Sequence, residues 1–191
     1  MKEVISMEQT HCREKSCAFT GHRPEKLVFA GTGGEAAGYA LLFEMLDHAV
    51  SGAVNRGYTH FITGMCRGID LWGAAAVLRM KQTHPEITLE AAVPHLGQEK
   101  SWNPTDRELY RRIYDACDVK TVLGDHYTQG CMQRRNRYMV DNAQLIIAVF
   151  DPAVSGGTAY TVNYAARHGR EIWNLLEKTN AILSLPADGI R

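Results

Sequence analysis

The apolar positions of this chain alternate between two spacings. Short continuous apolar runs, typical of strands buried on both faces of a sheet, lie at residues 16–19, 59–62, 87–93, 119–123, 145–150 and 171–175. Segments with apolar residues every three or four positions predict amphipathic helices, and they lie at residues 35–55, 69–82, 103–116, 132–142 and 156–168. This alternation predicts an α/β fold with a doubly wound, mostly parallel sheet of about six strands and helices on both faces.

The same pattern bounds the domain. A chain of 191 residues is long enough to form one domain with a sizeable hydrophobic core. The periodic region predicts a single domain over residues 16–176. The polar, aperiodic segment 1–15 and the uninformative segment 177–191 are expected to be loose tails.

Composition narrows the functional classes. Lys plus Arg and Asp plus Glu both number 21, so net charge gives no general attraction to nucleic acid or to an anionic membrane. No apolar run is long enough to span a bilayer, and the N-terminus lacks the apolar core of a signal peptide. The five cysteines include no CxxC pair, which favours reduced thiols over disulfides. We therefore expect a cytoplasmic protein with no membrane partner and no metal site.

Chemically suggestive loops follow the predicted strands. They are 20–23, 64–70, 94–99, 125–129 and 151–158. In an open parallel sheet, ligands bind beyond the carboxyl ends of the strands, so these loops predict a ligand site at one edge of the sheet.

The loop Ser155-Gly156-Gly157-Thr158 leads from a strand into a helix. The backbone N–H groups and partial positive charge of a helix start suit an anion, and glycines allow its close approach. An ordinary glycine turn with a threonine cap is the alternative. Asp70 has two comparable interpretations as well, stabilisation of a helix start or acceptance of hydrogen bonds from ribose hydroxyls.

Three arginines, Arg134, Arg135 and Arg137, precede the strand at 145–150. Such a run is ordinarily a solvated helix face, whereas guanidinium groups also match phosphate. Successive helical residues point about 100° apart, so the three arginines do not share one site. Arg135 is the predicted phosphate ligand.

The motifs taken together resemble the YpsA-like branch of the SLOG superfamily over about residues 16–175. The resemblance rests on Thr20-Gly21-His22-Arg23-Pro24, Thr63-Gly64-Met65 with Gly68 and Asp70, Gly97-Gln98-Glu99, the segment from Gly130 to Asp141, and Ser155-Gly156-Gly157-Thr158. It implies a Rossmann-like fold that binds nucleotides or their derivatives, with ADP-ribose-like ligands proposed for the branch.

The wider superfamily includes the LOG phosphoribohydrolases and the DNA-binding protein DprA. Met132, Arg135 and Met139 fit the first part of the LOG pattern, in which Arg135 matches the catalytic arginine. Thr161 stands at the position of the LOG catalytic glutamate. Because a carboxylate is needed to stabilise the cation-like sugar or to activate water, the resemblance implies retained phosphate binding and incomplete hydrolase machinery. Asp70, Glu99 and Asp151 are the carboxylates that could substitute.

We therefore predict binding or sensing of a nucleotide-derived small molecule, with N-glycosidic or phosphate-bond hydrolysis and single-stranded nucleic-acid binding as alternatives. No bound prosthetic cofactor is expected, nucleic acid is disfavoured, and a homodimer is the expected assembly. The predicted ligand-binding residues are Thr20, Gly21, His22, Arg23, Gly64, Met65, Gly68, Asp70, Glu99, Arg135, Asn136, Asp151, Gly156, Gly157 and Thr158.

Overall fold

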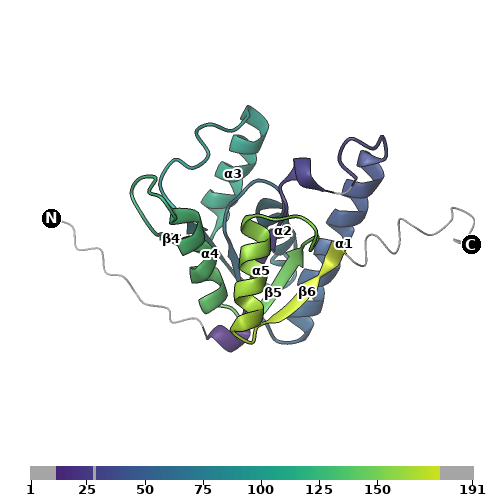
Figure 1. The fold of residues 1–191 in the computed structure, drawn as a ribbon. Coiled ribbons are helices and arrows are strands. Elements are labelled where there is room, and N and C mark those ends of the chain that lie inside the picture. Colours follow the sequence, from purple (N-terminus) through teal and green to yellow (C-terminus); the bar gives the residue numbers. More distant parts are fainter. Residues whose placement is uncertain (1–11, 28, 177–191) are drawn as a thin grey trace, which may run out of the picture.

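The structure is a computed structural model that describes residues 12–27 and 29–176. One sheet is flanked by helices on both faces (Figure 1). The strands are β1 (Ser16–Gly21), β2 (His60–Thr63), β3 (Thr88–Val93), β4 (Val119–Val122), β5 (Leu145–Val149) and β6 (Glu171–Asn174). The α-helices are α1 (Glu35–Asn55), α2 (Ile69–Met80), α3 (Pro104–Ala116), α4 (Cys131–Asp141) and α5 (Gly157–Arg167).

The strand order is β4-β3-β2-β1-β5-β6. Every neighbouring pair is parallel, so the predicted Rossmann-like fold is confirmed and the sheet is wholly rather than mostly parallel. The chain moves outward from β1 to β4 and then returns to place β5 on the other side of β1. That reversal makes the β1–β5 boundary the topological switch point, where open α/β sheets bind ligands.

The helices on the two faces of the sheet pack into two separate apolar clusters. One cluster contains Leu42 and Leu46 of α1 and Val77 of α2, which pack with Phe19 and Phe61 of the sheet. The smaller cluster on the opposite face takes its helical residues from α4 and α5. Right-handed crossovers explain this division, because reversing the strand order at β1 sends the later helices to the other face.

The segment 1–15, predicted as a loose tail, is partly ordered. Arg13–Lys15 form a short 3-10 helix, and Lys15 O accepts a hydrogen bond of 2.9 Å from Thr59 N–H, just before β2. Residues 1–11 and 177–191 of the predicted tails lie outside the described residues.

Within the described part of the chain, none of the helices is long and apolar enough to cross a membrane. The homodimer stays a prediction.

A buried polar network fastens α4 to the sheet. Glu90 of β3 accepts hydrogen bonds from His60 Nε2 (2.8 Å), Thr121 Oγ1 (2.6 Å) and Tyr138 Oη of α4 (2.6 Å). Burial opposes the charge of Glu90, but the three donors outweigh it and lower the pKa of the carboxyl. Glu90 is therefore an ionised, fully partnered carboxylate whose hydrogen bonds stabilise the position of α4.

We expect Tyr138→Phe to lower the free energy of unfolding by about 1.5–3 kcal/mol, because it removes a hydrogen bond to a buried charge. Tyr164→Phe is the matched control, since Tyr164 Oη donates to an exposed carboxylate, Asp141, at 3.1 Å. Urea denaturation measures both variants. Equal losses of stability in the two variants would contradict a special role for the Glu90 network.

Candidate functional site

A cleft of about 320 Å³ lies at the carboxyl end of the sheet, at the β1–β5 switch point. Its walls come from the end of β1, the β2–α2 loop, α4 and the start of α5. The lining residues are Thr20, Gly21, His22, Arg23, Glu25, Lys26, Cys66, Arg67, Asp70, Met132, Arg135, Asn136, Met139, Ser155, Gly156, Gly157 and Thr158. The volume falls at the lower end of the range for small-molecule sites.

His22 joins the loops that follow β1 and β5. Its backbone N–H donates to Val149 O (3.1 Å), and its ring Nε2 accepts a hydrogen bond from Asp151 N–H (2.9 Å). An Nε2 atom that accepts carries no proton, so the imidazole is neutral with its proton on Nδ1. Burial lowers the pKa of His22, and the positive charge of Lys26 adds to this, while Asp151 opposes it. The neutral ring keeps the two loops of the switch point together.

We expect this hydrogen bond to weaken in acid. The pKa of His22 is lowered in the folded state, so unfolding takes up a proton below about pH 6.5, the unperturbed histidine value, and stability falls there. The difference in unfolding free energy between the wild type and His22→Gln should be constant above about pH 7 and should shrink as the pH falls towards 5. Urea denaturation at several pH values measures it. A difference independent of pH would refute the neutral, accepting imidazole.

The floor of the cleft contains a buried ion pair. Arg135 Nη1 lies 3.3 Å from Asp70 Oδ2, with side-chain exposures of 5% and 8%. Arg135 also donates to Gly64 O and, through Nε, to Asn136 Oδ1 (2.7 Å). Asp70 Oδ2 accepts from Cys66 N–H (3.3 Å). Burial raises the pKa of Asp70, and the nearby Arg135 guanidinium offsets part of the rise.

This pairing changes the interpretation of Arg135. Its charge is balanced by Asp70, and its Nε and Nη1 groups already donate to protein acceptors, so Arg135 is first of all a structural link between α4 and the β2–α2 loop. Removing one partner of such a pair leaves an uncompensated buried charge and typically costs about 3–5 kcal/mol. A loss of binding in Arg135→Ala would therefore not distinguish a lost ligand contact from a disturbed cleft.

The start of α5 forms the opposite wall. Gly156 precedes the helix at φ +141°, a backbone conformation that favours glycine. The N-cap residue Gly156 has no side chain that could cap the helix. The first N–H groups of a helix lack intrahelical partners, and the residues that carry them here, Gly157 and Thr158, line the cleft. A Cβ added at Gly156 would lie 3.9 Å from Lys26 Nζ, and one added at Gly157 would lie 4.0 Å from Asn136 Nδ2. The turn thus brings backbone and side-chain donors together.

Some charged side chains of the lining are paired with an opposite charge and others are not. Arg67 is paired with Glu25 (3.0 Å) and Asp106 (3.3 Å), and Arg135 with Asp70. Arg23 and Lys26 form no ion pair with any carboxylate of residues 12–27 and 29–176. The cleft therefore presents a local excess of positive charge although the whole chain is formally neutral.

Most of the predicted ligand residues lie on this lining. They are Thr20, Gly21, His22, Arg23, Asp70, Arg135, Asn136, Gly156, Gly157 and Thr158. Five others do not line it, and their role in ligand binding stays a prediction: Gly64, Met65, Gly68, Glu99 and Asp151.

The position of each of these five residues has a physical reason. Gly64 packs against Arg135 and Asp70, where a Cβ would clash with both. Gly68 likewise packs against the backbone of His22. Met65 is fully buried at φ +57°. Glu99 belongs to the β3–α3 loop, away from the lining, and the Asp151 carboxylate accepts a local hydrogen bond from Ala153 N–H (2.9 Å).

Several lining residues were missing from the prediction. Lys26 and Glu25 lie on a short 3-10 helix, Pro24–Lys26, that no periodic signal marks. Cys66 and Arg67 lie within the 64–70 loop, which was predicted to border the site, but neither residue was predicted to bind the ligand.

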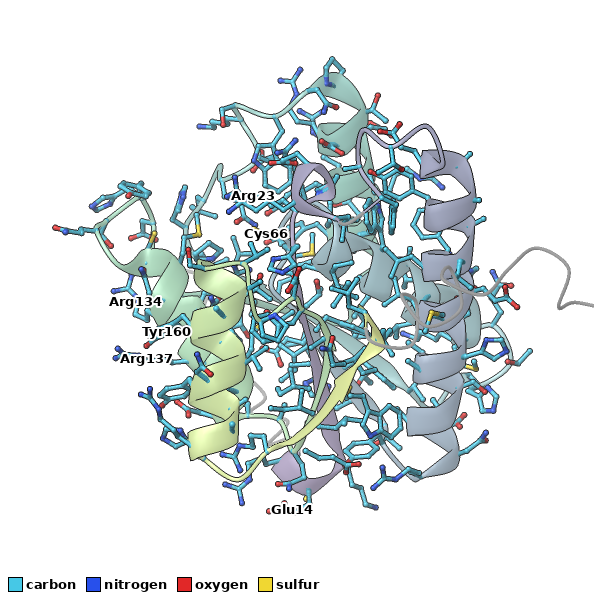
Figure 2. The ribbon with its side chains drawn as sticks, turned by 45° about the vertical axis from the view of Figure 1, so that its right-hand side comes forward. Glu14, Arg23, Cys66, Arg134, Arg137 and Tyr160 are labelled. Carbon is cyan, nitrogen blue, oxygen red and sulfur yellow. The ribbon has the colours of Figure 1, made fainter. Side chains whose placement is uncertain are left out.

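Arg134 and Arg137 point outward from α4, away from Arg23 and Cys66 (Figure 2), as helix geometry predicts when Arg135 faces inward.

Thr161 is buried on α5, and its hydroxyl donates to Gly157 O (2.8 Å). It does not line the cleft. The carboxylates that do line it are Glu25 and Asp70, both of them ion-paired. Among the residues that the structure describes, no group of three or more His, Cys, Asp or Glu side chains is arranged to hold a metal ion.

A family model described as the YspA SLOG family, and called YpsA, matches residues 17–176. The chain belongs to this family. It is 26% identical over 160 residues to the UPF0398 protein BH1768 of Halalkalibacterium halodurans, covering 82% of this chain and 83% of the relative. It is 31% identical over 129 residues to the uncharacterized SPbeta prophage-derived protein YoqJ of Bacillus subtilis, covering 60% of this chain and 75% of YoqJ.

Two solved structures share the fold of this YpsA-family chain. DNA processing protein A (DprA) from Streptococcus pneumoniae has a TM-score of 0.51 at 15% identity; the match covers 88% of this chain and 55% of the DprA chain. The structural genomics target TM1055 also has a TM-score of 0.51, at 17% identity and with 91% and 83% coverage. At these identities the likeness shows the fold alone.

Proposed function

We propose that this protein binds a nucleotide-derived small molecule, a nucleoside phosphate or an ADP-ribose-like ligand, in the switch-point cleft. Membership in the SLOG family supports a role with nucleotides or nucleic acids in general. The observation that favours a phosphorylated small molecule is the meeting of the α5 N-terminus with two uncompensated cations, Arg23 and Lys26.

In the proposed complex, the phosphate lies at the start of α5. The N–H groups of Gly157 and Thr158 donate to its oxygens, and the helix dipole favours its negative charge. Lys26 approaches this turn from the other side of the cleft and supplies a full positive charge. The sugar lies towards the floor of the cleft, where Asp70 and Asn136 offer polar groups.

We expect AMP or ADP-ribose to bind the wild-type protein in a calorimetric titration. Lys26→Ala and Arg23→Ala should each weaken binding about tenfold, which is about 1.4 kcal/mol, because each removes one unpaired charge near the phosphate. Both side chains are exposed, so folding should be unaffected.

Arg134→Ala is the matched control, since Arg134 is an exposed arginine that does not line the cleft. Its affinity should equal that of the wild type. Absence of binding for AMP, NAD and ADP-ribose alike would overturn the proposal. Equal weakening in Arg134→Ala and Lys26→Ala would show attraction by general charge rather than by this cleft.

A hydrolase that cleaves an N-glycosidic or phosphate bond is the second candidate, and Asp70 is the observation in its favour. Asp70 is a buried carboxylate of raised pKa on the cleft floor, which is a common property of acid–base catalysts. Its pairing with Arg135 and the hydroxyl of Thr161 at the position of the LOG glutamate weigh against this candidate.

A hydrolase predicts release of free base or phosphate from a panel of nucleotides above a protein-free blank. Asp70→Asn takes the buried partner of Arg135 away, so urea denaturation and circular dichroism first establish that the variant is folded. The folded variant should then release no product. Chromatography of the products measures this. We expect no release from the wild type, and release that depends on Asp70 would favour the hydrolase over simple binding.

A further inference from the structure

A second hollow, of about 600 Å³, lies beside the switch-point cleft along the same edge of the sheet. Most of its residues come from the β3–α3 loop, the β4–α4 loop and the start of α4. Arg23, Arg67 and Met132 line both the hollow and the cleft. The two spaces are therefore neighbours that share a wall, and a ligand longer than one nucleoside phosphate could occupy both.

The aromatic residues that line the hollow, Tyr127 and Trp102, form what we call its aromatic wall. Tyr127 is 66% exposed, and its ring meets His95 edge to face at 5.6 Å. Trp102 lines the hollow too and contacts Tyr110 in the same manner at 5.6 Å. Exposed aromatic rings held by their neighbours are platforms on which a planar base stacks.

The wall shared by the two spaces is positively charged. Arg67 is held by Glu25 of the Pro24–Lys26 helix and by Asp106 of α3, so its position is fixed and its charge is compensated. Arg23 is exposed and has no carboxylate partner among the described residues. An anionic group bridging the two spaces would pass Arg23.

Gln98 is a buried amide in the lining of the hollow. It is 7% exposed, and its Nε2 donates to Met65 O at 3.1 Å. Its Oε1 is buried and has no hydrogen-bond partner within the described residues. Gln98 therefore links the β3–α3 loop, which lines the hollow, to Met65 of the β2–α2 loop.

We propose that the hollow is a second subsite for a planar base, and that the ligand class is a dinucleotide, with two nucleosides joined through phosphates. One nucleoside phosphate lies in the switch-point cleft, the bridging phosphates pass Arg23, and the second base stacks on Tyr127. This inference rests on the proposed function, because it extends the ligand held in the cleft. A mononucleotide would leave the aromatic wall unused.

The test compares ADP with diadenosine diphosphate by calorimetry, using the full chain. Both probes contain two phosphates, but only the second probe has two bases. We expect diadenosine diphosphate to bind at least about fivefold more tightly. Tyr127→Ala should remove this gain, a loss of about 5- to 150-fold that corresponds to the about 1–3 kcal/mol of stacking one base, and should leave the affinity for ADP unchanged.

Tyr127→Phe is the matched control, because it keeps the ring and should keep the gain. Equal affinities for the two probes, or a gain that survives in Tyr127→Ala, would overturn the subsite. An equal loss for ADP in Tyr127→Ala would overturn the dinucleotide class, since a single base would then reach this wall. Failure of both probes to bind would overturn the proposed function and this inference together, whereas ADP binding that depends on Lys26 without a dinucleotide gain would overturn the inference alone.

Discussion

The Arg135 guanidinium joins α4 to the β2–α2 loop beneath the switch-point cleft. Its contacts with Asp70 and Gly64 O are buried, where an unpaired charge would be costly. Gly64 must be a glycine for this approach, since a Cβ there would meet both members of the pair. The position of α4, and with it one wall of the cleft, depends on this contact and on the Glu90–Tyr138 hydrogen bond nearby.

Much of the fold could be predicted from local patterns. The helix at 35–55 was predicted with its observed bounds because its apolar residues recur regularly and Gly57 follows it. The loops at 20–23 and 155–158 were predicted to meet because parallel strands end at one edge of a sheet. Both loops line the cleft.

The rest of the site depends on contacts between distant residues. Arg135 and Asp70 are 65 positions apart, so spacing could not show that each compensates the other. The neighbours of a site residue can also point elsewhere. Met65 is buried and Glu99 lies on another loop, although both belong to motifs of the family. Lys26 was missed because its short 3-10 helix has no periodic signal.

The proposed binding of a nucleotide fits this arrangement better than hydrolysis does, since the α5 N-terminus lines the cleft and both carboxylates of the lining are paired. The most direct test of this account is an NMR titration of the ¹⁵N-labelled protein with AMP. The account predicts that the amide resonances of Gly157 and Thr158 shift with AMP concentration, in step with binding. Saturating AMP that shifts amides elsewhere, or none, and leaves these two unchanged would contradict it.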